Sequence, residues 1–220
     1  DKCFEARSKI IISGVGKSGI IARKMASTFS SIGLTSIYLN PLDALHGDLG
    51  LLHNMDVCIF LSNSGETEEL LEVITHVKKR NIKVIALVGD INSSLAKLSD
   101  VVLQAKVEKE VCPLNLAPTT STAVAMAIGD AMATVWMRKK GISCEDFAIN
   151  HPAGSLGKKI SLSVSDLMIC RDQLHFLYIN DLFQDILKVI TKDGVGTGCV
   201  IESNSDKNLI GIITDGDLRR

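Results

Sequence analysis

The chain has 220 residues, of which 46% are hydrophobic and only 4% aromatic, and its formal net charge is −1. This length allows one large or two small domains around an aliphatic core. The balanced charge argues against a nucleic-acid-binding surface, and the longest apolar runs are too short for a membrane helix. The cysteines lack the close pairs typical of zinc sites, which indicates a reduced, cytoplasmic protein without a structural metal.

Both ends suggest that the sequence is part of a longer protein. It begins without Met, a few residues before the first expected strand, and it stops at "TDGDLRR", where a helix begins. The lack of a targeting segment therefore carries no weight.

Apolar runs that alternate with helical periodicity predict an α/β fold over the first 105 residues. The expected strands are 9–13, 36–39, 56–61, 83–88 and 100–105. One helix repeats apolar residues from Ile21 to Ile32 and stops at Gly33, and a second runs from about Glu66 to Arg80. The second is expected to bury Leu70, Leu71, Ile74 and Val77. Continuous apolar strands between helices predict a doubly wound, five-stranded parallel sheet covered on both faces.

The remainder of the chain has a different character. Residues 120–141 are rich in Ala and Met and apolar on nearly all sides, so we expect a helix buried against another helix or subunit. A second unit begins near residue 163, with a helix at about 181–192 and strands at 198–202 and 209–214. This unit is small enough to be marginally stable alone, and we expect it to pack on something outside the chain.

The stretch "SGVGKSG" places three glycines between a strand and a helix, and we call Gly14–Gly19 the glycine turn. Such a turn lets the backbone approach an anion, and the helix start offers unpaired N–H groups. A dinucleotide site would need an acidic residue at the end of the next strand, but the first one, Asp43, follows a proline. A nucleotide P-loop would need glycine at Ile11. A structural turn without a ligand stays open.

The stretch "SNSGET" also follows a strand and opens a helix, and we call Ser62–Thr67 the hydroxyl turn. Ser64 or Thr67 alone could be a helix N-cap, but three hydroxyls around Gly65 exceed that need. Because such turns meet at one edge of a parallel sheet, a small phosphorylated metabolite fits better than a dinucleotide. The expected phosphate-binding residues are Gly16, Ser18, Ser62, Ser64, Gly65 and Thr67.

Five stretches carry a family resemblance, in the order "GVGKSG", "HGDLG", "SNSGET", "EVCPLNLAPTTST" and "HPAGSLG". Together they resemble the sugar isomerase (SIS) domain of D-arabinose 5-phosphate isomerases. "GIITDGDLRR" resembles the end of the cystathionine-β-synthase (CBS) repeat that follows this domain. The resemblance implies an SIS-type, flavodoxin-like domain over residues 1–160, without the family's N-terminal helix, and a truncated first CBS repeat over 163–220.

The resemblance also implies a reaction. D-ribulose 5-phosphate and D-arabinose 5-phosphate would interconvert through an enediolate, without cofactor or metal, in a homotetramer that feeds 3-deoxy-D-manno-octulosonate (Kdo) and lipopolysaccharide synthesis. It implies Lys17 as a charge stabiliser, Glu66 and Glu110 as active-site carboxylates, and His151, then His46, for proton transfer. We further hypothesise that His151 completes the site of a neighbouring subunit.

Three alternatives remain. A non-catalytic sugar-phosphate sensor would share the phosphate-binding turns but would not need Glu110 together with two histidines. An isomerase for another phosphosugar is not distinguished, because the sequence does not fix the carbon number or the stereochemistry. An NAD-dependent oxidoreductase is the weakest of the three.

Overall fold

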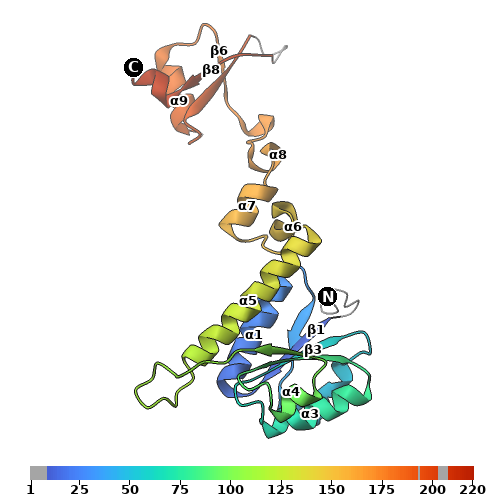
Figure 1. Ribbon diagram of the computed structural model, residues 1–220. Coiled ribbons are helices and arrows are strands. Elements are labelled where there is room, and N and C mark those ends of the chain that lie inside the picture. The colour runs from blue at the N-terminus through green and yellow to red at the C-terminus, as the bar shows by residue number, and fades with distance from the viewer. Residues whose placement is uncertain (1–8, 193, 203–207) are drawn as a thin grey trace. The chain divides into compact units, whose positions relative to one another are not determined.

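The computed structural model describes residues 9–192, 194–202 and 208–220 (Figure 1). Two compact units divide between Ser161 and Leu162. The strands of the first unit are β1 (Ile10–Gly14), β2 (Ser36–Tyr38), β3 (Val57–Ser62), β4 (Lys83–Val88) and β5 (Val101–Gln104). Its helices are α1 (Gly16–Ser31), α2 (Pro41–Leu45), the short 3-10 helix η2 (Asp48–Leu51), α3 (Glu68–Lys79), α4 (Ser94–Leu98), α5 (Thr120–Lys140), α6 (Cys144–Ile149) and α7 (Ser155–Ser161).

The five strands form one parallel sheet in the order β2-β1-β3-β4-β5, which confirms the predicted doubly wound fold. The chain first moves outward from β1 to β2 and then crosses back to β3 on the other side of β1. In the β1–β3 pair, Gly14 lies opposite Leu61. The glycine turn and the hydroxyl turn therefore leave the sheet from neighbouring strands at the same edge.

Alternate strand residues point into two separate cores. Ile10 and Ile12 pack toward α1 and α5, whereas Ile11 packs toward α3. Both cores are built mainly from aliphatic residues that are almost fully buried, with Phe29, Phe60 and Trp136 among them. Because each face is covered by helices, the strands need continuous apolar runs, as the sequence suggested.

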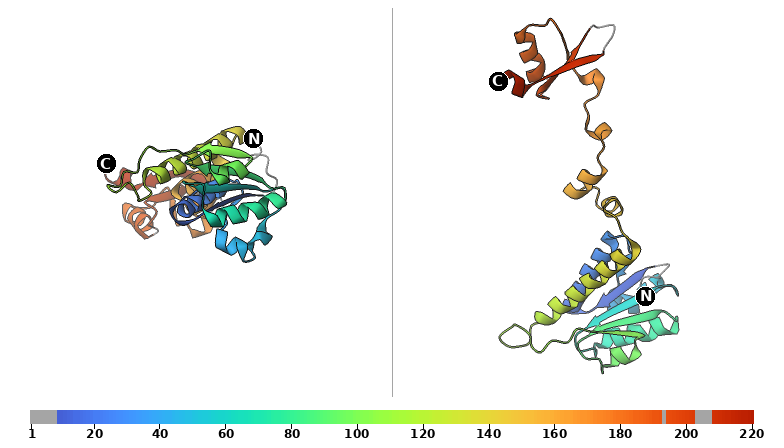
Figure 2. Two further views of the ribbon diagram at one scale, coloured as in Figure 1. Left: turned by 60° about the horizontal axis from the view of Figure 1, so that its bottom comes forward. Right: turned by 45° about the horizontal axis from the view of Figure 1, so that its top comes forward.

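The helix α5 lies along α1 (Figures 1 and 2). The close approach depends on Gly129, where an added Cβ would lie 2.6 Å from Met25 Cγ. Ala133 and Trp136 are buried on the same side, but the Met126 and Val135 side chains remain 38% and 54% exposed. The expectation of a helix packed against another helix is therefore confirmed by α1, which covers one side of α5, and the other apolar side of α5 remains exposed in the single chain.

Helix α3 begins at Glu68, two residues later than predicted, because Thr67 is still in extended conformation as its N-cap. Leu70 is fully buried, as expected. Leu71 is only partly buried and Val73 takes its place in the core. The predicted amphipathic helix is confirmed, but its buried face contains Val73 in place of Leu71.

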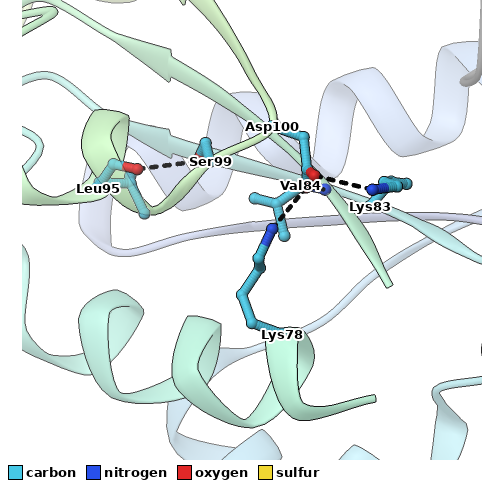
Figure 3. Close-up of polar contacts among 6 residues, drawn as sticks. All are labelled: Lys78, Lys83, Val84, Leu95, Ser99 and Asp100. Carbon is cyan, nitrogen blue, oxygen red and sulfur yellow. Dashed lines mark hydrogen bonds and ion pairs between the residues drawn. The ribbon is translucent and has the colours of Figure 1, made fainter. Parts of the chain in front are cut away.

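The carboxylate of Asp100, just before β5, ties three segments together (Figure 3). It accepts hydrogen bonds from Lys78 Nζ at 2.8 Å, Lys83 Nζ at 3.0 Å and the Val84 backbone N–H at 2.9 Å. Partial burial would raise the pKa of Asp100, but the bonds from Lys78, Val84 and Lys83 outweigh it and hold the pKa well below its usual range. Asp100 thereby links α3, β4 and the start of β5.

A second carboxylate, Asp56, is buried before β3, with its side chain 0% exposed. It accepts from Lys9 Nζ at 3.0 Å, from the Lys9 backbone N–H at 3.1 Å and from the His53 backbone N–H at 2.7 Å. Beside it, burial raises the pKa of the Cys58 thiol to about 12. Cys58 is thus the small core hydrophobe that its strand position predicted.

The second unit contains α8 (Val164–Leu167), the 3-10 helix η3 (Arg171–Gln173), β6 (Phe176–Tyr178), α9 (Phe183–Lys192), β7 (Thr197–Ile201), β8 (Leu209–Thr214) and α10 (Asp215–Leu218). β6 pairs parallel and β8 antiparallel with β7. Leu177, Ile190 and Ile201 form its small core, whereas Leu209 and Ile212 of β8 are about three-fifths exposed, 61% and 60%. Much apolar surface stays uncovered, and the CBS identity of this unit stays a prediction.

Candidate phosphate-binding site

The site begins where the strand order reverses, between β1 and β3. In doubly wound sheets, ligands bind in the crevice at the carboxyl ends of the two strands that flank such a reversal. The glycine turn follows β1 and opens α1, and the hydroxyl turn follows β3 and leads into α3. Both predicted phosphate-binding turns therefore lie at the expected crevice.

The hydroxyl turn is held by its own side chains. Ser62 Oγ lies 2.8 Å from Thr67 Oγ1 and 3.5 Å from Ser64 Oγ, and it accepts the Gly65 N–H at 3.0 Å. Ser64 Oγ accepts the Glu66 N–H at 3.2 Å. Thr67 is the N-cap residue of α3, yet among the described residues its side chain makes no capping bond. The alternative in which Thr67 is merely a cap therefore fails, and the three hydroxyls form one cluster.

Gly65 has a left-handed backbone, with φ +70°, and sits against the next loop. A Cβ at Gly65 would lie 2.1 Å from Ser93 Oγ. The Gly65 carbonyl accepts the Leu95 N–H at 3.0 Å, and the Asn63 carbonyl accepts the Gly89 N–H at 3.0 Å. The hydroxyl turn is thereby fixed to the loop that follows β4.

The glycine turn is equally close-packed. At Gly19, an added Cβ would lie 2.6 Å from the Gly14 carbonyl oxygen, which accepts the Tyr38 hydroxyl at 2.9 Å. Gly16 is left-handed, with φ +58°, and begins α1. Lys17 is the second residue of this helix, and its side chain is exposed.

A cavity of about 50 Å³ lies between the two turns and the start of α5. Ser18 of the glycine turn and Ser62 of the hydroxyl turn both line it. The other polar lining residues are Asn63, Ser121 and Thr122. The volume suits a small anionic group, and its hydroxyls and amide can donate hydrogen bonds to phosphate oxygens.

Asn63, Ser121 and Thr122 were not among the predicted site residues. A weak signal existed for the latter two, because "APTTST" is a polar stretch just before an apolar helix. That signal alone is equally typical of a helix N-cap. Only the packing of α5 along α1 brings its first turn to the crevice.

The carboxylate of Glu66 is bound at the start of α4. Its Oε1 accepts the Ser94 backbone N–H at 2.7 Å. That backbone bond, aided by the Ser94 side chain, lowers the pKa of Glu66. Glu66 therefore tethers the hydroxyl turn to the loop after β4, a contact that the sequence did not reveal.

Glu110 lies in the loop between β5 and α5. Its Oε2 accepts the Thr119 N–H at 2.8 Å, the Thr119 hydroxyl at 2.9 Å and the Ser121 N–H at 3.2 Å. The bonds from Ser121 and Thr119 outweigh desolvation and lower the pKa of Glu110 to about 2. Glu110 thus borders the cavity through Ser121, which lines it.

The two candidate histidines do not line this cavity in the described part of the chain. His46 is exposed at the C-terminal end of α2. His151 stacks on Phe147 at 3.9 Å, and its Nδ1 lies 2.8 Å from the Phe147 carbonyl oxygen. Its neighbour Asn150 packs 3.6 Å from where a Cβ would stand on Gly33, beyond the C-terminal end of α1.

His151 and Lys17 therefore lie at opposite ends of α1. The helix has 16 residues, which corresponds to a length of about 24 Å. A side chain cannot span that distance. One chain by itself does not bring Lys17 and His151 together.

No group of three His, Cys, Asp or Glu side chains in the described parts of the chain is arranged to hold a metal ion. None of the helices described is long and apolar enough to cross a membrane.

The doubly wound fold and its two strand-to-helix turns define a domain of the sugar isomerase (SIS) type. The SIS domain family matches residues 3–135, and the chain belongs to that family. A Salmonella typhi protein named arabinose 5-phosphate isomerase KdsD is 42% identical over all 220 residues. The protein of the same name from Francisella tularensis is 42% identical over 214 residues, 97% of this chain. The chain spans 66% of the first relative and 64% of the second, slightly less than two thirds of each.

Solved structures of related proteins have the same fold as the first unit. An Escherichia coli CFT073 protein in complex with arabinose 5-phosphate is 40% identical, with a TM-score of 0.67 over 68% of this chain and 80% of that chain. A Methanococcus jannaschii protein, for which a 3-hexulose-6-phosphate isomerase function was inferred, is 25% identical, with a TM-score of 0.58 over 69% of this chain and 80% of that one. The first unit therefore has the fold of phosphosugar-binding SIS domains.

Proposed function

We propose that the chain is the catalytic part of an isomerase that interconverts D-ribulose 5-phosphate and D-arabinose 5-phosphate. The observation that carries the proposal is one cavity to which both phosphate-type turns contribute a hydroxyl, Ser18 and Ser62. Support comes from the Salmonella and Francisella relatives, which are named arabinose 5-phosphate isomerases, and from the E. coli protein solved with arabinose 5-phosphate.

The phosphate group would bind between the two turns. The starts of α1 and α3 offer backbone N–H groups and the positive ends of two helix dipoles. The clustered hydroxyls of the hydroxyl turn supply further donors. The residues proposed to bind phosphate are Gly16, Ser18, Ser62, Ser64, Gly65 and Thr67.

The chemistry requires a base and a charge stabiliser. The base removes a proton from the carbon next to the carbonyl, an enediolate forms, and the proton returns to the neighbouring carbon. Lys17, exposed beside Ser18 at the cavity, would stabilise the enediolate charge. His151 is our first choice for proton exchange and His46 the second, because imidazole titrates near neutral pH.

Because His151 lies a helix length from Lys17, we propose that His151 of a second copy completes each site. The exposed side of α5 supports an assembly, and the resemblance implies a homotetramer. Mixed oligomers of inactive Lys17→Ala and inactive His151→Ala chains would then regain activity, because some sites would receive both native side chains. Mixed oligomers that stay inactive would contradict site sharing.

Incubation with D-ribulose 5-phosphate in deuterated water, followed by NMR, tests the reaction directly. We expect D-arabinose 5-phosphate that carries solvent deuterium at C2. Turnover of a hexulose phosphate instead would favour another phosphosugar isomerase, such as the one inferred for the Methanococcus jannaschii protein. Binding of sugar phosphate without turnover would favour a sensor.

Further parts of the proposal rest on the resemblance alone. The product would feed Kdo and lipopolysaccharide synthesis in the cytoplasm. Residues 163–220 would be the first CBS repeat, either a scaffold for assembly or part of a regulatory site.

A further inference from the structure

The loop between β5 and α5 is braced by side chains. The Glu110 N–H donates to Asn115 Oδ1 at 2.7 Å, and the Val111 N–H donates to Thr119 Oγ1 at 3.0 Å. The Ala117 N–H donates to the Cys112 sulfur at 3.4 Å. The loop, which Figure 1 draws at the start of α5, therefore has a defined shape although it contains no helix or strand.

The Glu110 carboxylate closes this loop onto α5. Its three partners belong to Thr119 and Ser121, and they all donate to the same oxygen, Oε2. Pro118, Ser121 and Thr122 line the cavity on either side of these contacts. The segment that Glu110 binds is thus the centre of one cavity wall.

We propose that Glu110 is a positioning residue, which fixes Pro118–Thr122 as a wall of the cavity and does not itself exchange a proton with the substrate. This inference rests on the proposed isomerase function. The Oε2 lone pairs are directed at backbone and hydroxyl donors of the wall, so this oxygen is already engaged in holding Thr119 and Ser121. A pKa of about 2 is also far from the neutral range in which a general base is effective.

The contacts allow a sharp test, because they use a single oxygen. In Glu110→Gln, the amide oxygen can take the place of Oε2 and accept the same donors, but the side chain can no longer act as a base. In Glu110→Ala, the Thr119 and Ser121 N–H groups lose their acceptor and the wall is released. Glu108→Ala is the matched control, because it removes a negative charge from the same loop at an exposed residue.

The steady-state kinetics of these variants are measured with D-ribulose 5-phosphate. We expect kcat of Glu110→Gln to fall less than about tenfold, because a lost general base costs about 100-fold or more. We expect KM of Glu110→Ala to rise about tenfold or more and Glu108→Ala to match the wild type. A fall in kcat of Glu110→Gln of about 100-fold with KM unchanged would identify Glu110 as the base and overturn the inference. Equal kinetics of Glu110→Ala and Glu108→Ala would overturn it as well.

Amide hydrogen exchange gives a readout that does not depend on turnover. The Thr119 and Ser121 amides should be protected in the wild type and in Glu110→Gln, and exchange faster in Glu110→Ala. Equal protection in all three would overturn the inference, even if the wild type were active. A wild type without isomerase activity would instead overturn the proposed function, while the exchange data would still show whether Glu110 holds the wall.

Discussion

Substitution of Gly65 by alanine is expected to destabilise the first unit by about 3 kcal/mol. The left-handed backbone, with φ +70°, costs an alanine about 1 kcal/mol. The new Cβ would stand 2.1 Å from Oγ and 2.4 Å from Cβ of Ser93, which is only 3% exposed. Ser93 is also the N-cap of α4. Its displacement would overpack this contact and weaken the cap, which together add about 2 kcal/mol to the loss of stability.

Two controls separate these contributions. Gly141→Ala has a similar φ of +66°, but its Cβ meets no described atom within 4 Å, so we expect a loss of only about 1 kcal/mol. In a Ser93→Gly background the clash disappears, and the added cost of Gly65→Ala should fall to about 1 kcal/mol.

Urea unfolding followed by the fluorescence of Trp136 is the assay. Trp136 is the single tryptophan and lies in the core of the first unit, 6% exposed. A Gly65→Ala cost that is no larger than that of Gly141→Ala, or that is unchanged in the Ser93→Gly background, would refute the reasoning. The contact between the hydroxyl turn and the loop after β4 would then not limit the position of the turn.

Three further substitutions test single contacts by urea unfolding. Asp100→Asn should cost about 1–2 kcal/mol at pH 7. Because the pKa of Asp100 is lowered in the folded chain, the contribution of its carboxylate to the free energy of unfolding is complete above about pH 4 and is lost as the pH falls. The unfolding free energies of the wild type and the variant should therefore converge at acid pH. A difference between them that does not change with pH would contradict this. Asp56→Ala should cost about 3 kcal/mol, since it leaves the Lys9 ammonium and the backbone N–H groups of Lys9 and His53 without this acceptor, and a loss below about 1 kcal/mol would count against a buried ion pair. Tyr38→Phe keeps the ring but removes the bond to the Gly14 carbonyl, so a loss of about 1 kcal/mol is expected, and no loss would mean that the hydroxyl does not hold the glycine turn.

The sequence was sufficient for the fold of the first unit. Each expected strand is present within two residues of its predicted bounds, and the parallel sheet follows from apolar runs that alternate with helices. Hydrophobic periodicity is a local property, and a buried strand or an amphipathic helix is recognisable in a few consecutive residues. The same locality made the positions of the two turns predictable, since glycine and hydroxyl residues mark the passage from a strand to a helix, whereas their binding of phosphate stays a prediction.

The tertiary structure alone decided which groups meet. No local pattern indicates that the Glu66 carboxylate caps α4, that Glu110 caps α5, or that Ser121 lines the cavity. Those partners depend on the strand order and on the packing of α5 along one side of α1, which bring distant segments together. The separation of His151 from Lys17 has the same origin. The sequence gives only their positions along the chain, whereas the tertiary structure places Lys17 at the N-terminal end of α1 and His151 near its C-terminal end.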